Sequence, residues 1–401
     1  MKKFIDRITS DTASLSDFAA DKGNVSELHA YLFAHRGQIY VTPEGLLWEI
    51  NRDSCWQNRS YRDDGEADGA VSILGKLDAK SIPDEIRIPE FISVGKVRLY
   101  TFLVGCDSAQ IPKEFHLSNL KVKEIRIPDN VRVLRNMTSY ARIRHFKFPR
   151  RMSFVSGSIL NDSPMLQTIE FGVSYPEGAA AQLAVKGCDS LHSVIFPDFC
   201  TLINMFSQYY IEKNVSGYSS GGCTLHSILD SVLKGRLQVG ISNQENISAI
   251  VMDNDVQEFR VYLDALRCTA LFDKIESLVF GSEFNIYTED AYGNGFDVVF
   301  QEVGRFGNLK KLYCPQGRIS IDDTCSGLRQ LEDVRLPCSL ETIEDMAFMN
   351  CTSLKHIAIP SSLSYIGQYA FYGTGVERVE IPKNCIVADN AFEEGVEVCR
   401  M

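Results

Sequence analysis

Long hydrophobic runs and blocks of positive charge are both missing from this sequence. No run of 18 apolar residues occurs, so the sequence predicts no membrane-spanning helix. The net charge is −11, from 41 basic and 52 acidic residues, and lysine and arginine are dispersed. Such a chain has no cluster of positive charge that could bind a polyanion, so we exclude a nucleic-acid partner.

The twelve cysteines form no C-x-x-C pair, and the closest two, Cys314 and Cys325, are eleven residues apart. This spacing excludes a zinc ribbon, and we predict no metal and no cofactor. Cys188 and Cys351 each lie nine residues before a proline that ends an apolar run, and Cys106 holds a similar place. We therefore predict that these three are buried thiols, because free cysteine behaves as a small core residue.

An apolar signal-peptide core is also missing from the N-terminus. Asp6, Arg7 and Asp11 interrupt the residues that follow the two initial lysines. As written, the sequence therefore predicts a cytoplasmic protein. If an export signal has been trimmed from it, the expected location is the cell surface or the medium.

What the sequence does contain is a repeat near its C-terminus. The segments LEDVRLP, LKHIAIP and VERVEIP end at Pro337, Pro360 and Pro382, which are 23 and 22 residues apart. A fixed period of this size indicates stacked units, because each unit is too small to bury its own apolar face and must pack against its neighbours.

Each unit combines a short strand with a loop that turns inward. In LKHIAIP the apolar Leu354, Ile357 and Ile359 surround outward-facing His356 and Ala358, and this alternation is typical of a β-strand. An Ala-Phe pair recurs downstream of each proline. We therefore predict a spine of stacked rings made by Phe348, Phe371 and Phe392.

The pattern extends toward the N-terminus with less regular spacing and gives eleven predicted strands. They end at or near Pro89, Pro128, Pro149, Gly172, Pro197, Asp253, Gly281, Pro315, Pro337, Pro360 and Pro382. The intervals are longest between Pro197 and Pro337, so we expect longer connections between the strands there.

The segment PCSLETIEDMAFMNCTSLKHIAIP (337–360) resembles the repeat unit of the BspA-like leucine-rich repeat family. The segment EIRIPEFISVGKVRLYTFLVGC (85–106) is similar to the first unit of that family. The resemblance implies an α/β repeat solenoid, a right-handed leucine-rich-repeat superhelix with one strand per repeat of about 22–23 residues. It also implies a bacterial protein with a binding or adhesive role, and it brings no catalytic residues.

Two parts of the chain depart from the repeat. Residues 1–79 predict an N-terminal cap of two short helices followed by a hairpin at IYVTPEGLLWEI (39–50). The apolar positions of those helices are Phe4, Ile5 and Ile8, then Val25, Leu28, Tyr31 and Leu32. Residues 80–401 form the predicted solenoid, most regular over 331–392, with a helical insertion at 198–246.

The outward side of the predicted strands is charged near both ends and apolar in the middle. Ile195, Val251, Val279 and Tyr313 fall in one row on four successive predicted strands. A soluble monomer seldom leaves such a stripe bare. Either it receives a partner, in a patch that also includes Lys311, Arg335 and His356, or the 198–246 insertion folds back and buries it.

We therefore predict a non-enzymatic protein that binds another protein through its strand face. One alternative is a surface adhesin for a host protein, matrix or glycan, and another is an enzyme with its site in the 198–246 insertion. Ser219 lies in a G-x-S-x-G match, but the surrounding Gly/Ser run indicates a linker. Asp64, Glu66 and Asp68 imitate the start of a calcium loop that lacks its final glutamate, so we predict an acidic loop there.

Overall fold

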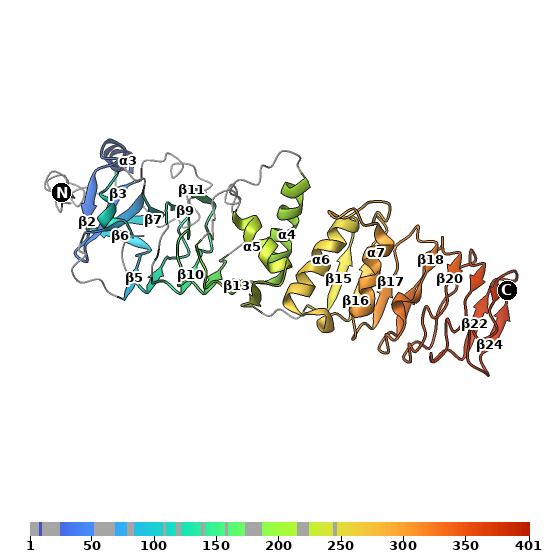
Figure 1. The fold of residues 1–401 in the computed structure, drawn as a ribbon. Helices are drawn as coiled ribbons and strands as arrows, with labels where there is room; N and C mark the ends of the chain where they lie inside the picture. The colour runs from blue at the N-terminus through green and yellow to red at the C-terminus, as the bar shows by residue number, and fades with distance from the viewer. Residues whose placement is uncertain are drawn as a thin grey trace. The chain divides into compact units, whose positions relative to one another are not determined.

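The chain forms two compact units, one of Met1–Tyr209 with Gly217–Asn243 and one of Tyr210–Ser216 with Gln244–Met401. A computed structural model (Figure 1) describes the following residues: 8–9, 25–51, 69–77, 84–106, 110–117, 122–137, 140, 142–156, 159–172, 187–214, 224–243 and 247–401. The segment with Ser219 and the acidic run 64–68 lie outside the described residues.

The N-terminal part of the first unit is a mixed sheet beside one helix. Helix α3 (Val25–Ala34) confirms the second predicted helix, and β2 (Ile39–Val41) pairs with β3 (Leu46–Ile50) as the predicted antiparallel hairpin. Tyr40 stacks on Trp48 at 4.5 Å between ring centroids, and both rings are buried. The first predicted helix lies mostly outside the described residues, and it is wrong at Ile8, which belongs to β1 (Ile8–Thr9).

This sheet continues from the hairpin into the repeats. Strand β4 (Gly69–Lys76) pairs antiparallel with β3 and parallel with β7 (Val97–Gly105). Beyond them the sheet contains β6 (Phe91–Val94), β9 (Val133–Arg135) and β11 (Phe154–Ser156). The predicted cap and the first repeats therefore share one hydrogen-bonded sheet.

The strands that the repeat pattern predicts form separate parallel ladders in the first unit. Strand β5 (Glu85–Arg87) pairs with β8 (Glu124–Arg126). Strands β10 (His145–Lys147), β12 (Thr168–Glu170), β13 (Ser193–Phe196) and β14 (Gln238–Ile241) make a second ladder. The 3-10 helix η3 (Lys113–Phe115) and the helix α5 (Thr224–Leu233) also belong to this unit. Helix α4 (Phe199–Asn214) belongs to it up to Tyr209, and its remaining residues are part of the second unit.

The second unit contains two four-stranded parallel ladders and one further pair of parallel strands. One contains β15 (Ala249–Met252), β16 (Ser277–Phe280), β17 (Lys311–Tyr313) and β19 (Asp333–Arg335). The other contains β18 (Ser320–Ile321), β20 (Thr342–Ile343), β21 (Tyr365–Ile366) and β23 (Ile386–Val387). At the C-terminal end β22 (Arg378–Ile381) pairs with β24 (Glu397–Arg400).

Ten of the eleven predicted strands are present, and the exception is LKHIAIP. Residues 354–360 are all described and form no strand. Leu354 is fully buried there, whereas Ile357 and Ile359 are only half-buried. Apolar alternation predicts which side chains turn inward, but it does not by itself create the hydrogen bonds of a ladder.

The longer connections expected in the middle of the chain contain helices. Helix α6 (Val256–Thr269) lies between β15 and β16, and α7 (Phe296–Phe300) lies between β16 and β17 (Figure 1). The remaining short 3-10 helices are η6 (Phe272–Lys274), η7 (Gln301–Arg305) and η8 (Asp323–Cys325). Phe259 of α6 meets Phe280 of β16 edge to face at 5.1 Å, so the helix packs on the sheet through aromatic rings.

Residues at both ends of α6 explain its boundaries. Asp255 accepts a hydrogen bond from the Glu258 amide at 3.0 Å, and the Glu258 carboxylate accepts one from the Asn254 amide, also at 3.0 Å. The Glu258 amide is one of those that the first helical turn leaves without a backbone partner, and the Glu258 carboxylate holds the chain just before the helix. Ala270 ends the helix with a left-handed φ of 55°.

The predicted phenylalanine spine is confirmed. Phe371 stacks on Phe348 at 5.4 Å and on Phe392 at 5.1 Å, with interplanar angles of 14° and 4°. The three residues occupy the same place in consecutive repeats, so equivalent rings lie face to face.

The turns of successive repeats also coincide. Asn350, Gly373 and Gly395 have left-handed φ values of 62°, 74° and 100°. A Cβ at Gly373 would lie 2.5 Å from Asn350 Oδ1 and would clash. Asparagine and glycine tolerate this backbone region best, which explains why these residue types recur at this turn.

The predicted burial of Cys106, Cys188 and Cys351 is confirmed. Cys188 Sγ donates to the Leu160 carbonyl at 2.9 Å, and Cys351 Sγ donates to the Cys325 carbonyl at 3.1 Å. Burial raises the pKa of both thiols, that of Cys351 to about 12. Both thiols therefore point into the stack and bond to the preceding repeat.

We expect iodoacetamide at about pH 8 to modify Cys200 and Cys338 of the folded protein while Cys188 and Cys351 remain intact, because the thiolate is the reactive form. Cys200 and Cys338 are exposed and serve as internal controls. Peptide mass spectrometry after a timed quench measures the labelling at each site. Equally fast labelling of Cys188 or Cys351 before denaturant is added would contradict the burial.

Candidate binding surface

The outward side of the first ladder in the second unit presents a row of side chains in register. Val251 is paired with Val279, Val279 with Tyr313, and Tyr313 with Arg335. Their neighbours along each strand, Ile250, Leu278, Leu312 and Val334, are buried. Strand geometry therefore turns the row away from the core. Val251 is 54% exposed.

Tyr313 is held in place by charged neighbours. The Arg335 guanidinium lies 4.0 Å from the centroid of the Tyr313 ring, and Lys311 Nζ lies 5.4 Å from it. The Tyr313 hydroxyl donates to Asp333 Oδ2 at 2.8 Å. Cation–π attraction and this hydrogen bond together restrict the position of the Tyr313 ring.

Two of the predicted patch residues do not belong to this row. Ile195 lies on β13 in the first unit, where its partner in register is Gly240 of β14 rather than Val251. The prediction of four successive strands from Ile195 to Tyr313 is therefore wrong, because β14 is an additional strand. His356 is exposed, as predicted, but lies in the segment 354–360 that forms no strand.

The charged side chains predicted on the outward side of the first unit pair with one another. Arg126 Nε lies 2.8 Å from a carboxylate oxygen of Glu85 and 2.7 Å from one of Glu124. Lys147 Nζ lies 2.6 Å from Glu170. Such exposed pairs contribute little to stability, and their charges largely cancel.

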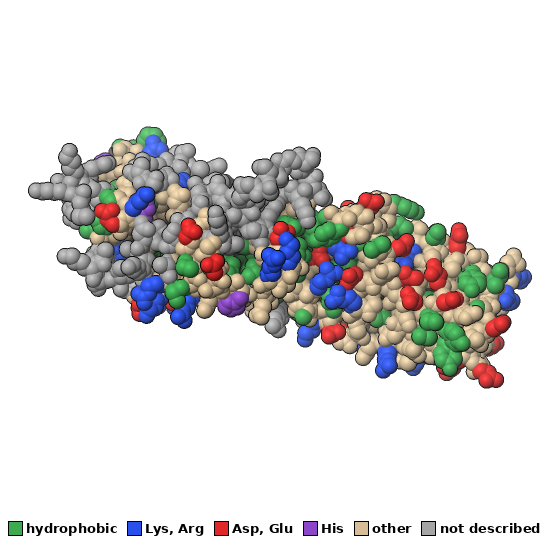
Figure 2. Space-filling model, in the orientation of Figure 1, with side chains coloured by type: hydrophobic (Ala, Val, Ile, Leu, Met, Phe, Trp, Pro, Cys, Tyr) green, Lys and Arg blue, Asp and Glu red, His purple; other side chains and the backbone are tan. Residues whose placement is uncertain are grey.

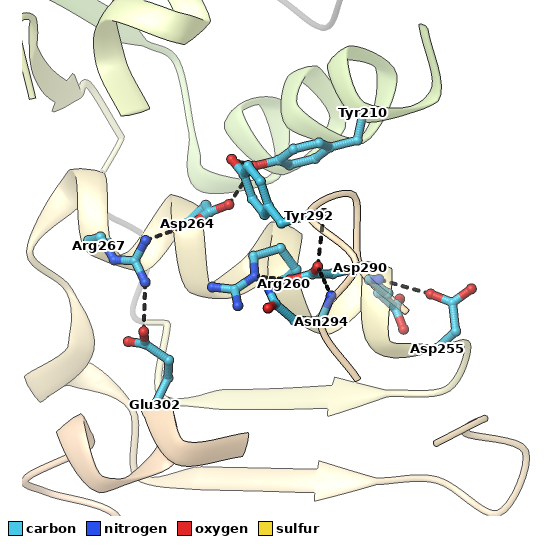
Figure 3. Close-up of polar contacts among 10 residues, drawn as sticks. Tyr210, Asp255, Arg260, Asp264, Arg267, Asp290, Tyr292, Asn294 and Glu302 are labelled. Atoms are coloured by element: carbon cyan, nitrogen blue, oxygen red, sulfur yellow. Dashed lines mark hydrogen bonds and ion pairs between the residues drawn. The ribbon is translucent and has the colours of Figure 1, made fainter. Parts of the chain in front are cut away.

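A buried polar cluster that sequence reasoning missed surrounds α6 in the second unit (Figure 3). Arg260 Nε donates to Asp290 Oδ2 at 2.7 Å, and both side chains are buried. The backbone amides of Tyr292 and Asn294 each donate to Asp290 Oδ1 at 2.9 Å. Burial alone would raise the pKa of Asp290, but these hydrogen bonds to Asn294, Arg260 and Tyr292 together lower it.

The second carboxylate of the cluster is Asp264, one turn further along α6. It accepts hydrogen bonds from the Tyr210 hydroxyl at 2.5 Å and from Arg267 Nη1 at 3.0 Å. The Tyr292 hydroxyl lies 2.9 Å from that of Tyr210. Burial raises the pKa of Asp264, although Tyr210 and the charges of Arg260 and Arg267 oppose this.

Two carboxylates with pKa values shifted in opposite directions are typical of acid–base catalysts, but they also occur in structural ion-pair networks. In this cluster side chains and amides of the chain itself occupy both oxygens of Asp264 and of Asp290. The cluster therefore fits a structural role, which is to fasten α6 to Tyr210 and to residues 290–294. Arg260 and Asp264 are four residues apart, a spacing that in sequence resembles an exposed helical ion pair.

Within the described part of the chain, no group of three or more His, Cys, Asp or Glu side chains could hold a metal ion. The helices described there are all too short or too polar to cross a membrane.

Comparison with solved structures gives matches to bacterial leucine-rich repeat proteins. One from Bacteroides ovatus shares 14% identity, covers 90% of this chain and 99% of its own, and has a TM-score of 0.28. A leucine-rich cell surface protein from Faecalibacterium prausnitzii shares 14% identity, covers 88% and 85%, and has a TM-score of 0.25. The pneumococcal vaccine antigen PcpA shares 12% identity, covers 91% and 99%, and has a TM-score of 0.21.

Comparison with curated proteins gives no match. Comparison with protein families matches the BspA type leucine-rich repeat region, in six copies over residues 109–216 and 304–397. Those ranges make up half of the chain, and they contain the spine, the recurring left-handed turns and most of the parallel strands. The chain belongs to the BspA type leucine-rich repeat family.

Proposed function

We propose that this protein is a non-enzymatic binding protein that holds a protein partner on the outward side of β15, β16, β17 and β19. The strand-face patch consists of Val251, Val279, Lys311, Tyr313 and Arg335. The observation that carries the proposal is the register of this row, in which Val251, 54% exposed, leads through Val279 to Tyr313 on consecutive parallel strands.

The chemistry of the patch supports a protein partner. Tyrosine and arginine are enriched among the residues that contribute most to protein–protein binding, and here Arg335 and Tyr313 already contact each other. Val251 and Val279 add apolar area beside them. Lys311 and Asp333 border Tyr313 with opposite charges, an arrangement that would set the orientation of a partner.

We further propose that the parallel ladders form a right-handed superhelix of leucine-rich repeats, with α4 and α5 as an insertion between repeats. The ladders are parallel in every pairing from β10 to β24, and a parallel crossover in one sheet is nearly always right-handed. Such a fold presents neighbouring strands as one continuous surface, which suits an extended partner better than a small substrate.

The variant Val251→Ser/Arg335→Ala tests the strand-face patch. Both side chains are exposed, so we expect the free energy of unfolding to change by about 0.5 kcal/mol or less. Binding of a partner should weaken at least about tenfold, because the variant removes apolar area and the guanidinium over Tyr313. The full chain is first used to capture partners from a cytosolic fraction and, separately, from a surface fraction, and the fraction that yields them tests the location. Surface plasmon resonance with the captured partners then measures the affinity of each variant.

The matched control is Ile386→Ser/Arg329→Ala, which removes the same kinds of side chain from exposed positions outside the patch. It should bind every partner as the parent chain does. Equal binding by both variants would contradict the strand-face patch. Loss of stability in Val251→Ser/Arg335→Ala would show that the row is part of the packing.

The enzyme alternative places its site in the 198–246 insertion. Tyr210, a described residue of that segment, donates to Asp264, and its hydroxyl lies 2.9 Å from that of Tyr292. Because groups of the chain itself already contact both oxygens of Asp264, this cluster favours the non-enzymatic proposal over the enzyme alternative.

A further inference from the structure

A pocket of about 770 Å³ lies in the second unit and is lined by residues other than those of the strand-face patch. Its walls come from residues 286–289, from the start of α7 at 295–298, from 317–320 with Asp322, and from Glu344. The volume is within the range of about 300–1,000 Å³ that is usual for ligand pockets. All of these residues belong to the same unit, so the pocket is complete within it.

Arg318 is a lining residue with an unsatisfied donor. Its side chain is only 4% exposed, and the guanidinium lies 4.0 Å from the centroid of the Phe300 ring. Nε donates to the Ser320 carbonyl, while Nη2 lies 3.6 Å from Asp297 and 3.8 Å from Asp322. Nη1 is buried and has no hydrogen-bond partner. A buried donor without an acceptor costs about 1–3 kcal/mol, so an acceptor supplied by a ligand would be favoured.

Negative charge dominates the rim of this pocket. Glu289, Asp297, Asp322 and Glu344 line it, and Arg318 is the one cation among its lining residues. Figure 2 shows acidic side chains gathered on the face of the second unit over α7, β18 and β20. A phosphate or carboxylate ligand would meet repulsion here, so the acceptor for Arg318 must be neutral and the ligand's charge positive.

Apolar side chains at the same pocket are unusually exposed. Tyr287 is 83% exposed, Ile319 60% and Val298 53%. All three line the pocket, next to the carboxylates. A ligand that matched this surface would place aliphatic or aromatic groups beside its positive charges.

We propose that this pocket binds an extended segment of a partner protein that carries lysine or arginine next to aliphatic side chains. A main-chain carbonyl of the segment accepts from Arg318 Nη1, its basic side chains pair with the rim carboxylates, and its aliphatic side chains cover Ile319, Val298 and Tyr287. A peptide segment combines a neutral acceptor, positive charge and apolar groups in one chain. The site is separate from the strand-face patch and does not depend on it.

Selection from a phage-displayed library of random eight-residue peptides, with the full chain immobilised, tests the proposal. We expect enriched peptides to contain lysine or arginine with leucine, isoleucine or valine. Isothermal titration calorimetry with the synthetic peptides should give an affinity that falls as sodium chloride is raised from about 0.05 to about 0.5 M. Enrichment of acidic or uncharged peptides, or of none, overturns the proposal.

The pocket variant is Asp297→Asn/Ile319→Ser, because the Asp297 side chain is 81% exposed and Ile319 is 60% exposed, so neither change threatens folding. Its affinity for the selected peptides should fall at least about tenfold. The matched control, Asp389→Asn/Ile386→Ser, alters exposed residues outside the pocket and should stay within about twofold of the parent. Equal affinities in both variants overturn the proposal.

Two further measurements distinguish peptide binding in this pocket from binding at the strand-face patch and from sugar binding. The variant Val251→Ser/Arg335→Ala should bind the selected peptides as the parent does, so the strand-face patch and the pocket can fail independently. A glycan array probed with the full chain tests neutral oligosaccharides, whose hydroxyls could also accept from Arg318. Binding there that disappears in Asp297→Asn/Ile319→Ser would overturn the peptide proposal in favour of a sugar site.

Discussion

Replacing Phe371 by alanine is expected to lower the free energy of unfolding by about 3–5 kcal/mol. The side chain is 1% exposed and its ring stacks between Phe348 and Phe392. Alanine would remove buried apolar area and also leave a cavity. The rings of Phe348 and Phe392 are held by their own repeats and cannot close the gap. Urea unfolding followed by far-UV circular dichroism measures the change.

Tyr372→Ala is the control for this prediction. Tyr372 is the next residue in the chain but is 45% exposed, so its removal should cost about 0.5 kcal/mol or less. Hydrogen exchange locates the effect, since the Phe371 amide donates to the Ala391 carbonyl and the Phe348 amide to that of Ala370. These amides should exchange faster in Phe371→Ala. A change equal to that of Tyr372→Ala would mean that the ring is not in the core.

The regular repeats could be predicted in detail because each position packs against a copy of itself. Phe371 stacks on Phe348 because the two residues occupy equivalent places in consecutive repeats, 23 residues apart. The burial of Cys351 follows from its place before Pro360, and the left-handed turn recurs where Asn350 and Gly373 tolerate it. Period alone therefore determines much of the core here.

Where the period is irregular, the pattern loses register. Strand β14 has the sequence Gln-Val-Gly-Ile, which is short and lacks a proline to mark its end. Because it pairs with β13, it changes the neighbour of Ile195 from Val251 to Gly240. The outward direction of Val251, Val279 and Tyr313 could still be predicted, because alternation within a single strand is enough for that.

Helix α6 and its polar cluster show a different limit of sequence reasoning. Helix α6 does have a helix signal in the sequence, although the strand repeat does not include it. Asp255 and Glu258 lie at its start, and the apolar Phe259, Leu263 and Leu266 follow at helical spacing. No comparable signal in the sequence indicates that Arg260 is buried. Asp290, thirty residues away, becomes its partner only because the loop at 290–294 folds over the helix.

Arg260→Leu is expected to lower the free energy of unfolding by about 3–5 kcal/mol at neutral pH, near the lower end because Asp290 keeps its amide donors. The variant leaves the Asp290 carboxylate buried without its cation. Urea unfolding gives the total change, and hydrogen exchange along α6 shows whether the helix is released first.

The effect of Asp290→Asn on the free energy of unfolding should have opposite signs in the parent chain and in Arg260→Leu. This comparison tests the Arg260–Asp290 pair itself. In the parent chain it removes the charge that Arg260 requires and destabilises. In Arg260→Leu it replaces an uncompensated buried charge with a neutral side chain that still accepts from the Tyr292 and Asn294 amides, so it should restore part of the loss. A double-mutant cycle in which Asp290→Asn costs the same in both backgrounds would contradict the buried pair.

The pH dependence of the Arg260→Leu defect gives an independent check. In the parent chain the folded pKa of Asp290 is lowered, so its contribution to stability is present above the unfolded pKa of about 3.9 and is lost as pH falls through the folded pKa. Without Arg260, Asp290 loses one of the groups that lower its folded pKa, so this pKa should rise relative to that of the parent chain. The carboxylate can then take up a proton in the folded variant at a higher pH than in the folded parent chain. The difference in unfolding free energy between parent and variant should therefore shrink as pH falls through the folded pKa of the variant, whereas a purely steric defect would stay constant.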